Sequence, residues 1–356
     1  MSRCTNALAF AMAACLTAMD LSSGAAAASP RPCTSEPRSA VAVIARSQAF
    51  ADTLTPTQRE VLVLELSPAK AIRWSNLPIR SVPRNGVRIG DLDASQRAAA
   101  QKLLETAMSS CGAALFDQIR AADDVLKAKD ANRSWDSGNY FVAFLGAPSA
   151  TAPWILQFGG HHVAFNIAFN SSHVSATPLF DGVEPLRFAV NGRDYQPLAR
   201  QEGAMTALVT SLAGTASARL DGAFKDVTRG PNPAGDANFP ITYPEGAVGR
   251  GALYATLSAA QKARVREAMR AWVELPQQAI SAPLMREYVR GTALAQTYVA
   301  FAGSSDLTIP GAYVRIDGPR IWIEFIVQPA IADPTTVHYH TIWRDKVADY
   351  GGAFGH

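Results

Sequence analysis

The alternation of hydrophobic and polar positions predicts runs of helix followed by runs of strand, twice along the chain. Three predicted helices begin with a leucine, a capping residue, two spacers and a glutamine, and these patterns start at Leu54, Leu92 and Leu257. The capping side chain accepts from the open N–H groups of the first turn, and the glutamine reaches back to the N–H of the cap. A degraded fourth copy predicts another helix start at Leu212.

Aromatic and β-branched segments follow the helices and predict strands. Two pairs of these strands resemble each other between the halves of the chain. They are residues 139–144 with 296–301, and residues 154–158 with 322–325. The first half is expected to turn at Gly159-Gly160, a tight hairpin signal, and to continue as a strand from His161. The second half is expected to take a longer turn through residues 329–336 and to continue through residues 337–345.

The spacing between matching signals is nearly constant along the chain. Leu92 and Leu257 are 165 residues apart, and the other offsets fall between 157 and 167. Such spacing indicates internal duplication, with chance similarity of amphipathic segments as the alternative. Helices followed by strands indicate an α+β fold rather than alternating α/β. We therefore expect two α+β pseudo-repeats, residues 29–200 and 201–356. They should pack as one compact unit about a pseudo-twofold axis, with antiparallel β-hairpins.

The first 28 residues have the features of an export signal. Arg3 is a minimal positive region, residues 7–18 are apolar, and small residues before Ala28 suit cleavage near that position. The apolar stretch is too short to span a bilayer, and no later segment is predicted to be transmembrane. We expect a periplasmic or secreted protein. The alternative is a lipoprotein anchored at Cys15.

The charge composition gives no reason to expect a nucleic-acid partner. The chain has 33 basic and 30 acidic residues and no Lys/Arg run, so it is not expected to attract nucleic acid electrostatically. After the signal the chain keeps two cysteines, Cys33 and Cys111. In an oxidising compartment these can form one disulfide, with two separate thiols as the alternative. They lack the short spacing of a cysteine metal site.

Four of the six histidines fall in two short segments, which are expected to form equivalent hairpin strands. His338 and His340 should point to one face, because alternate residues of a strand do. His162 should lie on the polar face of its strand and His161 on the apolar face. Neutral imidazole suits transition metals such as Zn, Fe or Cu. We therefore predict His162, His338 and His340 as metal ligands, with His161 as a further candidate.

Further residues are candidates for catalysis. Glu324 is predicted to be a ligand or general base, and Arg344 or Arg320 to bind an anionic group of a small-molecule ligand. This set suits a metal-dependent hydrolase or oxidoreductase. The alternatives are a non-catalytic periplasmic metal- or ligand-binding protein, and a structural protein with a histidine hydrogen-bond network. The chain has no phosphate-binding loop, dinucleotide fingerprint or nucleophile elbow.

These segments also carry a family resemblance. Residues 157–162, 180–185, 315–324 and 338–345 resemble the family called domain of unknown function 3500, and the similarity covers roughly residues 39–351. The resemblance implies an exported bacterial-type protein. It implies no activity, and it assigns a role to no residue.

Overall fold

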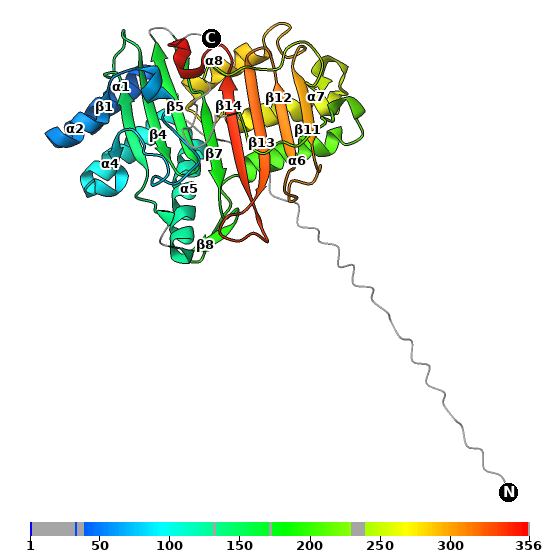
Figure 1. Cartoon of the computed structure of the whole chain (residues 1–356), viewed down its shortest axis with the longest axis horizontal. Coiled ribbons are helices and arrows are strands. Elements are labelled where there is room, and N and C mark those ends of the chain that lie inside the picture. Colours follow the sequence, from blue (N-terminus) through cyan, green and yellow to red (C-terminus); the bar gives the residue numbers. More distant parts are fainter. Residues whose placement is uncertain (2–32, 34–38, 131–132, 171–172, 229–238, 355–356) are drawn as a thin grey trace. The chain divides into compact units, whose positions relative to one another are not determined.

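The structure is a computed structural model, and it describes Met1, Cys33 and residues 39–130, 133–170, 173–228 and 239–354 (Figure 1). The predicted export signal and Cys15 lie outside these residues, apart from Met1. Residues 33–356 belong to one compact unit. Among the described residues, no helix has both the length and the apolar character needed to cross a bilayer.

The described part of the chain contains eight α-helices. They are α1 (Ala40–Asp52), α2 (Pro56–Leu62), α3 (Pro68–Ala71), α4 (Ala94–Ala107), α5 (Ser110–Lys129), α6 (Ala199–Leu212), α7 (Ala259–Val273) and α8 (Gln278–Val289). Reciprocal capping boxes at Thr55, Asp93 and Ser258 start α2, α4 and α7, which confirms the three predicted patterns. The predicted fourth start is wrong, because Leu212 ends α6. That copy has no glutamine at the position that would close a capping box.

Strands from both halves of the chain form one sheet. The strands are β1 (Val63–Leu64), β2 (Val87–Arg88), β3 (Phe141–Leu145), β4 (Trp154–Gly160), β5 (Val163–Asn170), β6 (His173–Ser175), β7 (Leu179–Val183), β8 (Phe188–Val190), β9 (Arg193–Tyr195), β10 (Ala252–Leu253), β11 (Tyr298–Ala302), β12 (Tyr313–Asp317), β13 (Ile321–Pro329) and β14 (Val337–Asp345). Their order is β1-β3-β4-β5-β7-β14-β13-β12-β11-β10, with β2 on β3 and β6 on β5. β8 and β9 form a separate hairpin. The predicted α+β class is confirmed.

The two halves of the sheet meet where β7 pairs with β14. These strands run antiparallel, from Tyr339 opposite Val183 to Trp343 opposite Leu179. Counted outward from this junction, β4 takes the place of β12 and β5 that of β13. The sequence comparison expected residues 154–158 to occupy the place of residues 322–325. This expectation is wrong, because residues 154–158 lie in β4 and residues 322–325 in β13. The expected boundary after residue 200 falls in the first turn of α6. Duplication about a twofold axis stays a prediction.

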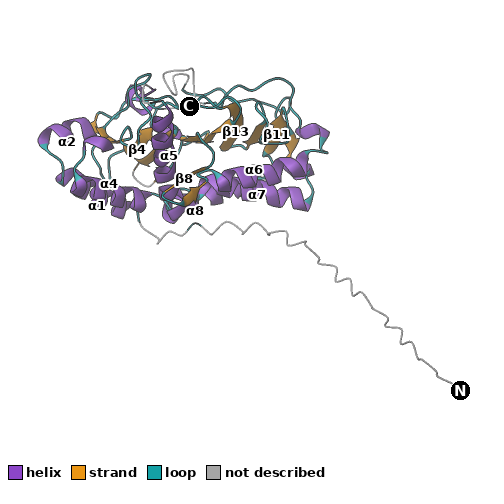
Figure 2. Cartoon of the chain, turned by 90° about the horizontal axis from the view of Figure 1, so that it is seen from below, coloured by secondary structure: helices purple, strands orange, loops and turns teal. Residues whose placement is uncertain are grey.

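Helices line one face of the sheet, and the residues of β14 that point toward them show how that face is packed. Figure 2 shows α1, α4, α6, α7 and α8 along this face. Trp272 of α7 donates its indole N–H to Thr341 Oγ1 at 2.7 Å. Tyr288 of α8 packs edge-on against Trp343. All four side chains are fully buried, so this face forms the main hydrophobic core.

Loops cover the opposite face of the sheet (Figure 2). His338, His340 and Ile342 of β14 point to this face, because they alternate with Thr341 and Trp343. Trp74, in the loop between α3 and β2, packs on Phe180 of β7 with ring centroids 5.5 Å apart. Trp74, Phe180 and Ile342 belong to a second apolar cluster on this face. This cluster anchors a loop to the strands that carry the histidines, so the loop can bring further polar groups to them.

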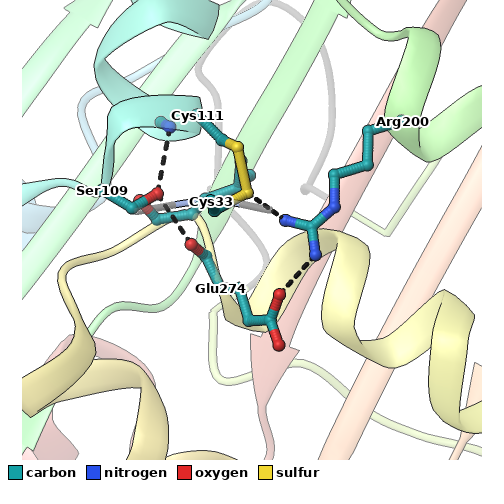
Figure 3. Close-up of a disulfide and its surroundings, with 7 residues drawn as sticks. Cys33, Ser109, Cys111, Arg200 and Glu274 are labelled. Carbon is teal, nitrogen blue, oxygen red and sulfur yellow. Dashed lines mark hydrogen bonds and ion pairs between the residues drawn. A yellow bond between two sulfur atoms is a disulfide. The ribbon is translucent and has the colours of Figure 1, made fainter. Parts of the chain in front are cut away.

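A disulfide joins Cys33 to Cys111 in the first turn of α5 (Figure 3). Ser109 caps this helix by accepting from the N–H of Gly112. Arg200 of α6 contacts Cys33 Sγ and pairs with Glu274. The predicted pairing is therefore present. The bond closes a loop whose ends are 78 residues apart. Disulfides that close loops usually add roughly 2–4 kcal/mol to the free energy of unfolding.

One buried carboxyl predicts a pH dependence of stability. Burial raises the pKa of Asp181 on β7 to about 7, and the bond from Thr341 Oγ1 at 2.8 Å only partly opposes this. The unfolded carboxyl releases its proton near pH 4. Between these values the folded state binds more protons, so stability falls as the pH rises from about 4 to about 7.

We expect Asp181→Asn to remove this dependence. The difference in unfolding free energy between pH 5 and pH 8 should shrink by about 2–3 kcal/mol. Urea denaturation at the two pH values measures it. Asp221→Asn, which changes an exposed carboxyl, is the control. An unchanged pH dependence in Asp181→Asn would show that Asp181 is ionised in the folded protein at pH 5.

Candidate metal centre

His161 and His162 form the two-residue loop of the β4–β5 hairpin. Gly160 pairs with Val163, so the prediction that Gly159-Gly160 makes the turn is wrong. A Cβ atom on Gly160 would collide with the ring of Tyr140, which means that this glycine allows close packing rather than a turn. His162 has a φ of 62°, a left-handed conformation that is uncommon outside glycine. The turn holds the His162 ring in a direction that regular strand geometry would not give.

His338 and His340 lie on one face of β14, as predicted. Gly182 of β7 pairs with His340, and its N–H donates to the carbonyl of His162 at 2.8 Å. A Cβ atom on Gly182 would lie 2.8 Å from the Tyr339 carbonyl oxygen, 2.9 Å from His340 Cδ2 and 3.1 Å from His162 Cδ2. The missing side chain therefore leaves space in which the two rings approach. The histidine segments do not occupy equivalent positions, because one is a hairpin loop and the other a central strand.

The three imidazoles converge through their Nε2 atoms. His340 Nε2 lies 3.2 Å from His338 Nε2 and 3.2 Å from His162 Nε2. One nitrogen atom can be chosen from each ring so that all three lie within 4.8 Å of one another. Tetrahedral zinc with bonds of about 2.0–2.1 Å separates its nitrogen ligands by about 3.3 Å. The observed spacing fits three ligands of one ion.

Burial keeps at least two of these rings neutral. It lowers the pKa of His162 well below the ordinary value, and His161, His340 and His338 lower it further. Burial, followed by His340, lowers the pKa of His338 to about 3, against a smaller upward effect of the Pro329 backbone. All three side chains are at most 4% exposed. Neutral imidazole is the form that binds metal, because its free nitrogen keeps a lone pair.

Carboxylates lie near the Nδ1 atoms of two of the histidines, His340 and His338. Asp226 Oδ1 lies 3.0 Å from His340 Nδ1, which fixes the tautomer with the proton on Nδ1 and the lone pair on Nε2. Asn76 lies 3.4 Å from the same Nδ1 atom. Glu184 Oε2 is 4.0 Å from His338 Nδ1, and the other oxygen of Glu184 accepts from the Ala332 N–H. The contact between Asp226 and His340, in which a carboxylate orients a histidine, is typical of metal sites.

His161 lies outside the group of three. Its Nδ1 is 2.7 Å from Asp123 Oδ1, and its ring stacks on His162 with centroids 3.8 Å apart. The Tyr140 hydroxyl donates to the His161 carbonyl at 2.7 Å. Burial raises the pKa of Asp123, while His161 pulls it down. His161 and Asp123 therefore form a buried support that holds the ring of His162 in place.

Glu324 and Arg344 lie on the same face of the sheet but further along their strands. Glu324 accepts from Tyr313 at 2.6 Å and from Trp322 at 2.7 Å, and none of its contacts reaches the histidines. Arg344 donates to the Thr228 carbonyl at 2.7 Å and to Asp349 at 2.8 Å. Arg320 pairs with Asp345 at 2.6 Å. The structure brings together three of the predicted metal ligands and separates them from the predicted catalytic residues.

A cavity of about 480 Å³ opens beside the three histidines. Pockets for small-molecule ligands have about 300–1,000 Å³. Besides the histidines, the lining residues that matter for binding are Asn76, Arg80, Arg133, Trp135, Glu184 and Asp226. The group of ligand atoms thus forms part of a cavity wall, and a bound ion would be accessible to a small molecule.

Sequence reasoning missed several residues of this site. Asp226 and Asn76 lie in segments without a motif, and only tertiary contacts bring them to His340. Gly182 carried a signal, because a glycine inside an apolar strand often marks the close approach of another group. Asp123 lies on α5 among buried apolar residues, and such a carboxylate usually has a partner.

Comparisons with known proteins give a family and no activity. Residues 36–352 match the model of a family described as a protein of unknown function (DUF3500), which confirms the resemblance found in the sequence. No curated protein and no solved structure matches the chain. The comparisons therefore assign no role to the histidines.

Gly182→Ala tests the space between the rings. The added Cβ should displace His340 and His162, and the affinity for zinc should fall about tenfold or more, as it does when support for a ligand is lost. Competition with a chelating dye measures this affinity. Gly203→Ala is the matched control, because a Cβ there meets nothing within 4 Å. Equal affinities of the two folded variants would contradict the role given to Gly182.

Proposed function

This chain belongs to the DUF3500 family of proteins of unknown function, and from its geometry we propose that it is an exported, metal-dependent enzyme that acts on a small molecule. His162, His338 and His340 hold one transition metal ion through their Nε2 atoms. The observation that carries this proposal is the convergence of three buried Nε2 atoms at the wall of a cavity.

The ligand set supports a catalytic rather than a structural metal. Structural zinc sites usually have four protein ligands, whereas catalytic sites have three and leave a position for water or substrate. Here three histidines face a cavity large enough for a small molecule. A bound ion would supply Lewis-acid chemistry and lower the pKa of a bound water. Imidazole suits Zn, Fe and Cu, so both hydrolysis and oxidation-reduction agree with this ligand set.

The surrounding residues have separate roles in this proposal. Asp226 orients His340 through Nδ1, and the His161–Asp123 pair supports His162. Glu324 and Arg344 hold neighbouring loops through the Thr228 backbone. Glu324 and Arg344 have no contact with the substrate in this proposal, because their polar groups already form hydrogen bonds with these and other protein groups.

Two other functions are compatible with parts of this geometry. A non-catalytic metal-binding protein would use the same three ligands and would show no turnover. A structural hydrogen-bond network is the second alternative. In it, His340 Nε2 would accept from His338 and His162, each 3.2 Å away, and no metal would bind.

The disulfide supports export. Disulfides form and persist in oxidising compartments and are rare in the cytosol. We expect the protein recovered from the periplasm or medium to begin near residue 29 and to contain the Cys33–Cys111 bond. Intact mass and non-reducing peptide mapping measure both. A chain that keeps its first 28 residues, or that carries free thiols, would contradict export and cleavage. A lipid on Cys15 would support the anchored alternative.

Metal content tests the proposed centre directly. We expect untagged protein to bind one equivalent of a transition metal, and His162→Ala, His338→Ala and His340→Ala to lose it while staying folded. Asp226→Asn should keep the site but weaken it by about 10–100-fold, because the orienting carboxylate is gone. Elemental analysis after reloading and competition titrations give these values, with Asp221→Asn as the control. Protein that takes up no metal would instead support the hydrogen-bond network.

A further inference from the structure

We infer that the cavity beside the three histidines takes a small organic anion. The indole N–H of Trp135 and the guanidinium of Arg133 hold its carboxylate or phosphate oxygens. The inference rests on the proposed function, because it names the class of substrate that the metal centre receives. It is carried by residues that contact none of the proposed metal ligands through a hydrogen bond.

Trp135 offers an indole N–H that has no acceptor among the described residues. Its side chain lines the cavity and is 3% exposed, yet within the described part of the chain its Nε1 has no hydrogen-bond partner. A buried N–H without an acceptor costs about 1–3 kcal/mol. A ligand oxygen in the cavity would satisfy this donor. Tryptophan can only donate through Nε1, so the ligand must supply an acceptor.

Arg133 places a positive charge beside this donor. Its guanidinium lies over the Trp135 ring, with the Cζ atom 5.6 Å from the centroid. Its ion pair with Asp130 is 3.2 Å long, and the arginine side chain is 54% exposed. Such an exposed pair contributes little, so it restrains the guanidinium weakly. Arginine presents several N–H groups in one plane, which matches the oxygens of a carboxylate or phosphate.

The charges in the cavity favour an anion. Arg80 and Arg133 are its cationic side chains, and Glu184 and Asp226 are its carboxylates. Both carboxylates are engaged beside the histidines, Asp226 with His340 Nδ1 and Glu184 with the Ala332 N–H. The charges of these four side chains cancel. A bound divalent ion would therefore leave the cavity positive, and it would attract an anion.

The rest of the lining favours an organic body on that anion. Leu77, Pro78, Ile331 and Trp135 contribute the apolar part of the cavity lining, here called its apolar wall. A volume of about 480 Å³ is larger than an inorganic anion needs and suits a compact aryl or alkyl group. The inferred ligand is thus an aryl or alkyl carboxylate or phosphate, with its body against the apolar wall.

Titration calorimetry with three small probes tests this inference. Phenylacetate and phenyl phosphate are the anions, and phenylacetamide is the neutral analogue. We expect metal-loaded protein to bind at least one anion about tenfold more tightly than the amide, and the stronger anion distinguishes a carboxylate from a phosphate substrate. Trp135→Phe, which keeps the ring, and Arg133→Gln should each weaken anion binding about tenfold.

Two controls separate this inference from the metal proposal. Arg193→Gln removes an exposed arginine that lies 5.2 Å over the Tyr195 ring, away from the cavity lining, and should leave anion binding unchanged. Metal content is measured on every variant, and Trp135→Phe and Arg133→Gln should keep a full equivalent. If the amide binds as tightly as the anions, or if both variants bind anions like the wild type, the inference is wrong while the metal centre stands.

The titrations also test the anion site if the wild-type protein binds no metal. In that case the metal proposal fails, and the same probes are titrated against the metal-free protein. Anion binding that depends on Trp135 and Arg133 would keep the anion site. Absence of such binding would overturn it as well.

Discussion

The pairing of β7 with β14 is the interaction on which the rest of the structure depends. These strands join the two halves of the sheet through five residue pairs, from Tyr339–Val183 to Trp343–Leu179. The pairing also sets Gly182 opposite His340, while the Gly182 N–H holds the carbonyl of His162. One glycine thus joins the hairpin loop to the central strand. A change of register by one residue would move His340 to the helix-covered face and would abolish the site.

The alternation of residues along β14 separates stability from chemistry. Thr341 and Trp343 face the helices, where Trp272 and Tyr288 close the main core. His340 faces loops, and loops can supply polar groups that a helix-packed core would exclude. Asp226 and Asn76 reach the site in this way. The same strand therefore serves the core with one face and the proposed metal centre with the other, so its position is fixed from the side away from the chemistry.

The site is strongly asymmetric, although the sheet has a similar strand order in both directions from its centre. His162 is held by a left-handed turn, by stacking on His161 and by the buried Asp123 behind it. His340 is held by strand geometry and by Asp226. One side of the histidine group forms part of the cavity wall. Trp135 and the arginines lie in that wall, which makes anion recognition and metal binding parts of one proposed site.

The sequence by itself determined features that depend on a few neighbouring residues. The capping boxes at Thr55, Asp93 and Ser258 and the common face of His338 and His340 were predicted correctly, because local hydrogen bonds and strand alternation decide them. Only the tertiary structure decided the rest. Gly160 packs closely against Tyr140 and belongs to β4, and the turn that was expected at Gly159-Gly160 lies at His161 and His162. The partners of those histidines come from distant segments, and which segments meet depends on strand order, which no local pattern encodes.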